Sequence, residues 1–238
     1  MTTLITRALP AATHEARIER ARQALEGLSV GDAFGECFFV RGEVLVLMLQ
    51  ERGLRPAPWR WTDDTAMALS IVDELSAHHE IRPDSLAERF AHRYAENRMR
   101  GYGGGAHQVL QEIYTGTPWQ KASRELFEGM GSMGNGGAMR SAPVGAYFAE
   151  DLEMVVEQAR RSAMPTHAHH DGQCGAIAIA VATAIAHRMR AGLAPREPQL
   201  LLDVAIAYTS RRANPRHPRV RQDHPAHGRR THGCSCAR

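Results

Sequence analysis

Two adjacent carboxylates between threonines form the densest cluster of oxygen ligands in the sequence. They lie in the motif Trp-Thr-Asp-Asp-Thr at residues 61–65, at the expected start of a helix. Hard oxygen ligands suit Mg²⁺, which takes one or two protein carboxylates and keeps water or substrate phosphate in its other positions. The same residues would also make an ordinary helix N-cap, with the acids favourably placed against the helix dipole. The motif alone leaves both interpretations open.

A histidine-rich segment, Thr-His-Ala-His-His-Asp at residues 166–171, is the second candidate site. Three imidazoles and an acid could bind Zn, Fe or Ni. They could also form a loop in which one histidine contacts a ligand and the others are solvated. No second pair of His or carboxylate ligands at helical spacing supports a metal, so the loop is the favoured interpretation.

The four cysteines are expected to be reduced thiols, because no secretion signal is recognised in the chain. Cys234 and Cys236 stand beside His232. Zinc sites usually use two cysteines separated by two to four residues, together with a second pair of ligands. The sequence therefore does not favour a zinc site here.

Two glycine-rich segments, residues 101–105 (GYGGG) and 131–137 (GSMGNGG), are expected to lead directly into helices. Free backbone N–H groups at such a junction, together with the helix dipole, can bind a phosphate. One such loop would be explained by helix termination alone. Two of them in one bundle favour an anionic ligand.

The elements that must position these residues are helices almost throughout. In residues 13–28, apolar side chains recur at helical spacing. Residues 172–189 are alanine-rich and apolar on several faces, which indicates a buried helix at the centre of a bundle. Further helices are predicted over 62–79, 84–99, 104–114, 118–127, 139–148, 151–164 and 199–208. Residues 43–50 could be helix or strand, and the predicted fold class is all-α.

The composition fits one soluble globular domain. The chain has 238 residues, of which 43% are hydrophobic and 23% charged. The longest nearly uninterrupted apolar run, residues 175–186, is too short to cross a hydrocarbon layer of ~30 Å. The first residues contain no apolar stretch typical of a secretion signal. We therefore expect no membrane association and a cytoplasmic location.

The net charge of +3 is unevenly distributed along the chain. Residues 211–238 contain eight Arg and one acid, whereas residues 1–210 contain 21 basic and 25 acidic side chains. Nucleic-acid binding requires a basic patch or a basic arm. Because the body is mildly acidic, only this arm could serve that purpose.

Five segments jointly resemble the ADP-ribosylglycohydrolase family, particularly its bacterial branch. They are GLSVGDAFGE (27–36), WTDDTAMAL (61–69), RGYGGG (100–105), GSMGNGGAMRSAPVG (131–145) and THAHHDGQCGAIAIAVA (166–182). The resemblance implies an orthogonal bundle of helices and a binuclear Mg²⁺ site. It also implies hydrolysis of the glycosidic bond between ADP-ribose and a modified side chain, commonly arginine or serine.

The resemblance assigns roles to individual residues. Thr62, Asp63 and Asp64 match the family's first metal-ligand motif, and the two carboxylates are also candidate catalytic groups. Glu36 follows the Gly-Asp-Ala-Phe-Gly motif, after which many members place a catalytic or gating glutamate. The positions that match ADP-ribose-contacting residues are Tyr102, Gly103, Gly104, Gly105, Gly134, Asn135, Gly136, Met139 and His167.

The chemistry of the family is consistent with these residue types. Two Mg²⁺ ions about 3.5–4 Å apart can clamp and activate an oxygen nucleophile. The leaving side chain departs from an anomeric carbon with oxocarbenium character. Carboxylates near that carbon would stabilise the developing positive charge.

The sequence departs from the family on its C-terminal side. The family's second metal motif, roughly Gly-Asp-Thr-Asp-Thr, does not occur, and the resemblance fades after about Tyr208. Residues 211–238 are rich in Arg, Pro and His and cannot bury enough surface to offset the entropy of ordering. We therefore expect a helical domain over 13–210, a disordered tail over 211–238 and one Mg²⁺ half-site. A single lysine against 28 arginines suggests GC-rich DNA, and a frameshift near residue 210 is our hypothesis for the tail.

Three functions remain open. The first is Mg²⁺-dependent hydrolysis of ADP-ribosyl groups on proteins or small molecules, impaired by the missing second motif. The second is binding of ADP-ribose or a nucleotide without catalysis. The third is nucleic-acid association through the basic tail, which would weaken steeply with salt. The acidic body makes this third function the least favoured.

Overall fold

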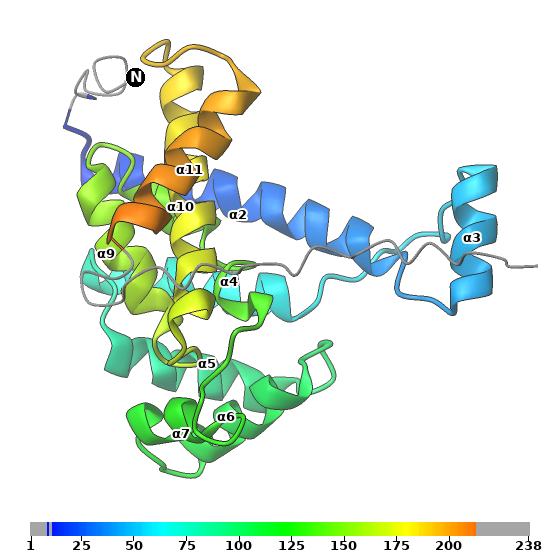
Figure 1. Cartoon of the computed structure of the whole chain (residues 1–238). Coiled ribbons are helices and arrows are strands. Elements are labelled where there is room, and N and C mark those ends of the chain that lie inside the picture. Colours follow the sequence, from blue (N-terminus) through cyan, green and yellow to red (C-terminus); the bar gives the residue numbers. More distant parts are fainter. Residues whose placement is uncertain (1–8, 10, 213–238) are drawn as a thin grey trace, which may run out of the picture.

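Helices connected by loops make up the whole of the described structure. The computed structural model describes residues 9 and 11–212, and no strand occurs among them, which confirms the all-α expectation. In chain order the α-helices are α2 (His14–Glu36), α3 (Gly42–Glu51), α4 (Asp63–His78), α5 (Pro83–Glu96), α6 (Gly104–Tyr114), α7 (Trp119–Glu125), α8 (Ala142–Tyr147), α9 (Leu152–Ala163), α10 (His170–Arg190) and α11 (Pro198–Arg212) (Figure 1). A 3₁₀ helix, η1 (Asn135–Gly137), lies between α7 and α8.

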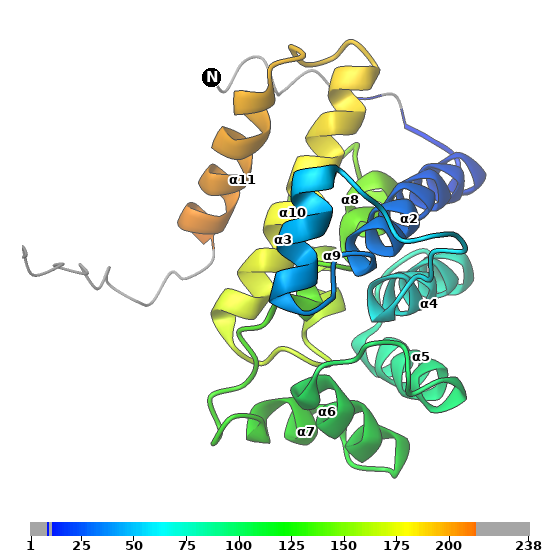
Figure 2. The ribbon, with the colours of Figure 1, turned by 90° about the vertical axis from the view of Figure 1, so that its right-hand side faces the viewer.

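Helix α10 lies at the centre of the bundle, as its alanine-rich, apolar sequence predicts. It packs against α8, α9 and α11, and Figure 2 shows it in yellow between α8 and α11. Ala176, Ala180 and Ala184 are fully buried. A Cβ atom at Gly145 of α8 would collide with the Ala180 carbonyl oxygen. Small residues on both helices therefore allow the two backbones to touch.

Two predicted boundaries are clearly wrong, and one ambiguous segment is resolved. Helix α2 continues to Glu36 instead of ending at residue 28, because its last turns pack against α4 and bond to the start of that helix. The ambiguous segment at 43–50 is helical. The glycine segment 131–137 does not lead directly into an α-helix, since η1 and a turn precede α8. Pro143 lies in the first turn of α8, where its missing N–H costs nothing, so an α-helix starting at 139 was a wrong prediction.

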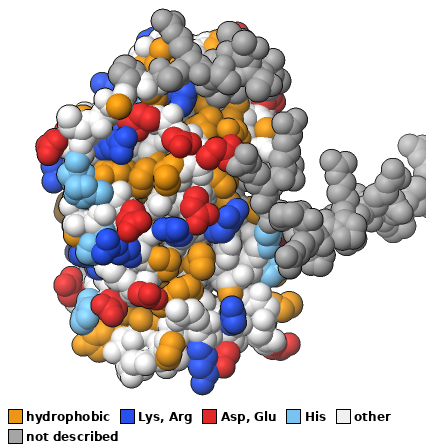
Figure 3. Space-filling view, turned by 90° about the vertical axis from the view of Figure 1, so that its left-hand side faces the viewer, with side chains coloured by type: hydrophobic (Ala, Val, Ile, Leu, Met, Phe, Trp, Pro, Cys, Tyr) orange, Lys and Arg blue, Asp and Glu red, His pale blue; other side chains and the backbone are white. Residues whose placement is uncertain are grey.

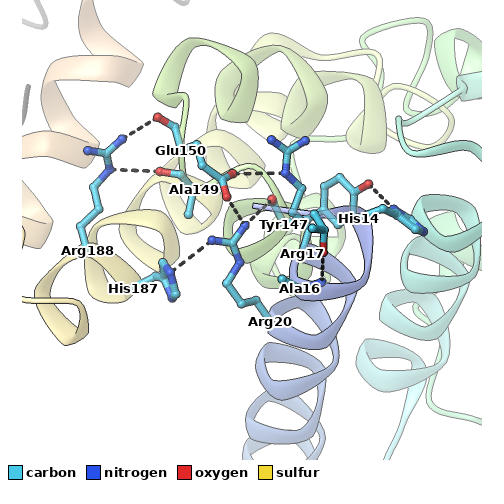
Figure 4. Close-up of polar contacts among 10 residues, drawn as sticks. His14, Ala16, Arg17, Arg20, Tyr147, Ala149, Glu150, His187 and Arg188 are labelled. Atoms are coloured by element: carbon cyan, nitrogen blue, oxygen red, sulfur yellow. Dashed lines mark hydrogen bonds and ion pairs between the residues drawn. The ribbon is translucent and has the colours of Figure 1, made fainter. Parts of the chain in front are cut away.

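A network of arginines fixes α2 to the connection between α8 and α9 (Figure 4). Arg20 donates to the Glu150 carboxylate at 2.5 Å and to the Tyr147 carbonyl at 3.2 Å, while Arg17 lies 3.5 Å from the same carboxylate. From α10, Arg188 donates to the Glu150 carbonyl at 2.8 Å. Breaking one member of such a partly buried network would leave the others without compensation. The network therefore sets the position of α2, and with it the end that approaches α4.

Helix α3 stands apart from the rest of the bundle (Figure 1). None of its residues is buried, and the exposed fractions of Val46 and Leu49 are 54% and 60%. Ile206 on α11 is also exposed, at 61%. Apolar side chains on a folded surface that are this open mark a surface suited to association.

The described helices lack the length and hydrophobicity needed to span a membrane. On the face drawn in Figure 3, acidic and basic side chains alternate around apolar ones, and the described residues show no basic patch there. Most of the predicted disordered tail, including Cys234 and Cys236, lies outside the described residues. The hypothesis of a frameshift and that of nucleic-acid binding through this tail remain untested.

Candidate functional site

The start of α4, which carries the carboxylate motif, is held by a side chain from α2. Thr62 is the N-cap residue of α4, but its own side chain forms no cap hydrogen bond. Asp32 instead accepts hydrogen bonds from the Thr62 N–H (2.8 Å) and hydroxyl (2.7 Å), and from the Thr65 N–H (3.1 Å) and hydroxyl (2.6 Å). The cap of α4 is thus supplied by a residue of α2. It orients the first turn of α4, and Asp63 and Asp64 are not needed to cap the helix.

Asp63 and Asp64 are half-buried carboxylates in a crowded negative field. Burial raises the pKa of both, and the charge of Asp32 raises each further; the pKa of Asp64 reaches about 6. Such a group is costly to keep ionised unless a cation compensates it. Carboxylate oxygens are hard ligands, and a divalent cation bound here would relieve the repulsion between these charges. Within the described residues, no three His, Cys, Asp or Glu side chains lie together as metal ligands would. A metal role for Thr62, Asp63 and Asp64 therefore stays a prediction.

A cavity of about 200 Å³ adjoins this helix start and brings together four segments far apart in the sequence. Its lining includes Asp63 and Met67 of α4, Gly103, Gly105, Ala106 and Val109 at the start of α6, Leu126, Phe127, Ser132, Gly134, Asn135, Gly136, Met139 and Arg140 from the second glycine segment and its flanks, and Thr166 and His167. Both glycine segments and the histidine segment therefore converge on the carboxylate motif. This convergence could not be derived from any one motif alone.

The first glycine segment is tied directly to the carboxylate motif. The Arg100 guanidinium stacks 3.5 Å above the centre of the Trp61 ring and donates to the Trp61 carbonyl at 3.2 Å. Gly101 has a φ of +90° and lies so close to Thr62 that an added Cβ would be 3.4 Å from the threonine Cβ. The left-handed conformation and the close approach both favour glycine. Helix α6 then begins at Gly104 with its free N–H groups beside the cavity.

On the opposite wall, the second glycine segment packs against His167. A Cβ at Gly136 would lie 2.9 Å from His167 Cε1, so only glycine fits against this ring. Burial, together with the charge of Arg140, lowers the pKa of His167 to about 3. The imidazole is therefore neutral at physiological pH and acts as a hydrogen-bonding and stacking surface.

The sequence profile of ADP-ribosylglycohydrolase matches residues 13–231. The chain belongs to the ADP-ribosylglycohydrolase family. The match extends beyond Tyr208, so the expectation that the resemblance fades there was wrong.

Curated members of the ADP-ribosylglycohydrolase family align with most of this chain. It is 35% identical to the ADP-ribosylhydrolase ARH3 of Xenopus tropicalis over 76% of this chain and 53% of the relative, and 34% identical to that of Homo sapiens over 71% and 50%. It is 26% identical to the ADP-ribosylarginine hydrolase Tri1 of Serratia proteamaculans over 63% and 42%. The chain thus spans about half the length of the curated relatives that it matches.

A solved structure supports the fold of this family member. It is described as an ADP-ribosylglycohydrolase-related protein complex, and it superposes with a TM-score of 0.52 at 27% identity. The superposition covers 79% of this chain and 61% of that chain. The helical bundle is therefore the family fold.

Not every predicted site residue lines the cavity. Tyr102 is 5% exposed and packs edge-on against Tyr94, with the ring centroids 5.1 Å apart. Burial raises the pKa of its hydroxyl, and the charge of Asp63 raises it further. Glu36 lies at a separate pocket of about 310 Å³, beside Trp59. The structure therefore does not bring Glu36 together with Asp63, and its role stays a prediction. Thr62, Asp64 and Gly104 adjoin lining residues in the chain without being among them.

Three residues of this family member were missed by sequence reasoning. Asp32 was noticed only as part of a motif. Thr62 and Thr65 at the start of α4 make no cap hydrogen bond themselves, so their N–H groups need an acceptor from another helix. Phe127 lines the cavity with a φ of +52° and 52% of its surface exposed. Arg140 is a fully buried cation in the cavity wall. No pattern in the sequence separates these last two from ordinary surface or core residues.

The other two histidines of the histidine segment, His169 and His170, make local contacts at the start of α10. His169 caps α10 by accepting from the Asp171 N–H at 3.1 Å, and His170 Nδ1 lies 3.4 Å from the Asp171 carboxylate. Within the described residues these groups do not form a metal cluster. The favoured interpretation, a loop in which His167 alone faces the ligand cavity, agrees with this arrangement.

Proposed function

We propose that this protein is a Mg²⁺-dependent hydrolase of ADP-ribosyl groups. The observation that carries the proposal is the single cavity on which Asp63, two glycine segments and His167 converge. Such a site offers carboxylates, close backbone N–H groups and a neutral imidazole to one ligand. A diphosphate linked to ribose presents matching features, namely an anion and several hydroxyls.

Thr62, Asp63 and Asp64 are the residues that would hold the cation. Their fit rests on two half-buried carboxylates whose pKa values are raised by burial and by the charge of Asp32. When bound, Mg²⁺ would supply charge neutralisation and activation of an oxygen nucleophile. The fixed first turn of α4, held by Asp32, keeps these ligands in one orientation.

The protein's own groups would carry the remaining tasks. The N–H groups at the start of α6 and the backbone around Asn135 would bind the diphosphate and ribose. Asp63 and Asp64, when ionised, would stabilise positive charge that develops on the anomeric carbon as the glycosidic bond breaks. His167 would contact the ligand as a neutral ring and would not act as an acid.

The substrate class follows from the family and from the names of its members. Relatives are named as ADP-ribosylhydrolases and as an ADP-ribosylarginine hydrolase. We therefore propose an ADP-ribosylated protein or a small ADP-ribose-containing molecule as partner, with arginine and serine as the side chains to test. A cytoplasmic location and the absence of a membrane role belong to the same proposal.

We further propose that hydrolysis by the 238-residue chain is impaired. The sequence contains the family's first metal motif but not the second. Loss of the second half of a two-metal clamp would reduce turnover at least ~10²-fold, or about 2.7 kcal/mol of transition-state stabilisation. Binding of ADP-ribose without turnover is the second candidate, and the convergence of both glycine segments and His167 on one cavity favours it.

Calorimetry with ADP-ribose, with and without Mg²⁺, is the primary test. Binding that strengthens with Mg²⁺ supports the metal-dependent site, and no binding under either condition contradicts the proposal. Turnover of ADP-ribosylated arginine and serine peptides at saturating Mg²⁺ then separates the two candidates. A rate equal to that of a relative twice as long would disprove the proposed impairment.

A further inference from the structure

Arg140 is a buried cation in the wall of the cavity. Only 1% of its surface is exposed. Its Nη2 donates to the Ser162 carbonyl at 2.9 Å and to the Thr166 hydroxyl at 2.8 Å, and its guanidinium carbon lies 4.4 Å from the centre of the Phe90 ring. These contacts fix the guanidinium in one orientation. A buried charge is costly, so its retention beside a binding site needs a reason beyond packing.

The Thr166 hydroxyl passes this orientation on to His167. A hydroxyl has one hydrogen to donate, and Arg140, which can only donate, takes the role of donor to the Thr166 oxygen. Two acceptors compete for the Thr166 hydrogen: His167 Nδ1 at 2.8 Å and the Ala163 carbonyl at 3.5 Å. The shorter contact, to His167 Nδ1, makes the stronger hydrogen bond, so we assign the Thr166 hydrogen to it. His167 Nδ1 is therefore an acceptor, and the ring proton is held on Nε2.

The other side of the ring bears on the second glycine segment. A Cβ at Gly136 would lie 2.9 Å from His167 Cε1 and 3.4 Å from His167 Nε2, so the Nε2 side of the ring packs against this segment. The contacts run without interruption from Arg140 through Thr166 and His167 to Gly136. A change at the buried end therefore reaches the loop that lines the cavity.

We propose that Arg140 is a positioning residue: through the Thr166 hydroxyl it holds His167 in its Nε2–H tautomer, and that ring fixes the loop from Gly134 to Gly136 for its ligand. Without Arg140, the Thr166 hydroxyl could equally accept from an Nδ1–H, and the ring would exchange between two tautomers. Only one of these tautomers carries its proton on Nε2, the ring nitrogen nearest to Gly136. The buried charge thus selects the conformation of the wall.

The test uses the full chain and three variants at the relay. Thr166→Val removes the hydroxyl and keeps the shape, Thr166→Ser restores the hydroxyl, and Arg140→Met removes the guanidinium. Ser162→Ala is the matched control, because the Ser162 side chain is equally buried and donates to the Ala159 carbonyl outside the relay. The first readout is the long-range ¹H–¹⁵N spectrum of the His167 imidazole, which reports the tautomer without any ligand.

We expect the Nε2–H tautomer in the parent, in Thr166→Ser and in Ser162→Ala, and a tautomeric mixture in Thr166→Val. Arg140→Met should give the same mixture wherever circular dichroism shows that it folds. If the competent state falls to a tenth of the population, ADP-ribose affinity falls about tenfold in Thr166→Val. Affinity in Thr166→Ser and in Ser162→Ala should stay near that of the parent.

An unchanged tautomer in Thr166→Val overturns the proposal, and so does an equal effect of Ser162→Ala. The affinity measurement rests on the proposed function, whereas the tautomer measurement does not. Failure of the parent to bind ADP-ribose would therefore count against the proposed function, and the spectra would still decide the relay.

Discussion

The Asp32 carboxylate accepts hydrogen bonds from both the backbone N–H and the hydroxyl of Thr65, at 3.1 and 2.6 Å. An acid near the end of α2 thus supplies the cap that α4 lacks. Helix caps normally come from the residue that precedes the helix. Here the cap also links α2 to α4, so the orientation of the carboxylate motif depends on how two helices pack.

Asp32→Ala should destabilise the protein by about 2 kcal/mol, because it leaves two N–H groups and two hydroxyls without their acceptor. Urea unfolding followed by circular dichroism measures this loss. Asp73→Ala is the control: its carboxylate is exposed and pairs with Arg93 at 2.6 Å, so its removal should cost less than about 1 kcal/mol. Equal losses in the two variants would show that Asp32 is an ordinary surface acid.

The buried His167 predicts a fall in stability as the pH drops below about 6.5. Its pKa in the folded protein is lowered to about 3 by burial and by Arg140. Between these two values the unfolded chain binds a proton that the folded protein does not, so the free energy of unfolding rises with pH across this window. From about pH 7.5 to about pH 5.5 the parent should lose roughly 1.4 kcal/mol more than His167→Gln.

Urea unfolding of the parent and of His167→Gln at both pH values provides the measurement. Asp63 and Asp64 titrate in both proteins, so their effect cancels in the difference between parent and variant. Parallel pH dependences would mean that His167 takes up its proton at the same pH in the folded protein as in the unfolded chain, which would contradict the lowered pKa.

Gly136→Val should weaken ADP-ribose binding about tenfold or more, because the new side chain must displace the His167 ring that it would meet at 2.9 Å. Helical circular dichroism should be kept, since the position lies in a 3₁₀ turn outside the α-helices. Gly27→Val is the control: its Cβ would meet nothing within 4 Å. Unchanged affinity in Gly136→Val would remove this loop from the binding site.

Mg²⁺ should raise the melting temperature of the parent, and the rise should disappear in the double variant Asp63→Ala, Asp64→Ala. A proton competes with the cation for Asp64, whose pKa is about 6 because of burial and the charges of Asp32 and Asp63. The Mg²⁺-dependent rise should therefore shrink below about pH 6. Differential scanning fluorimetry measures it, with Glu43→Ala, Glu51→Ala on the exposed α3 as the matched control. A double variant at 63 and 64 that still responds to Mg²⁺ would reduce the motif to a helix cap.

The exposed apolar side chains of α3 should make the chain self-associate. Val46→Lys combined with Leu49→Lys removes two residues that are 54% and 60% exposed. The parent should show a mass that increases with concentration in light scattering after gel filtration, and this variant should be nearer to a monomer. Because neither residue contributes to the core, the melting temperature should change little. A monomeric parent at all concentrations would contradict this expectation.

The fold could be predicted from the sequence wherever a single helix carried its own signal. Helix α10 was recognised by its alanines, and α4 by its caps and apolar spacing. The end of α2 was not, because residues 29–36 become helical through contacts with α4 that no local pattern encodes. Tertiary packing overrides local preference in such segments.

Part of the cavity lining could be predicted from the motifs, but the residues that support it could not. Gly136 and His167, which belong to two separate motifs, line one cavity. Asp32 lies on α2 and Arg140 in the turn before α8, and their bonding partners are 30 and 26 residues away in the chain. A motif records which residues meet the ligand, whereas these two are defined by what they meet across the core.

The contact between Gly145 and Ala180 leaves no room for a side chain, whereas other glycines in this chain, such as Gly103, have open space around them. At Gly145 even a methyl group would force α8 and α10 apart, so no replacement should survive a genetic selection for soluble expression alone. At Gly103, where an added Cβ meets nothing within 4 Å, alanine should pass that selection. Deep mutational scanning would thus divide the glycines into those that the fold requires and those that only a ligand could require. The second group would outline the binding surface before any ligand had been identified.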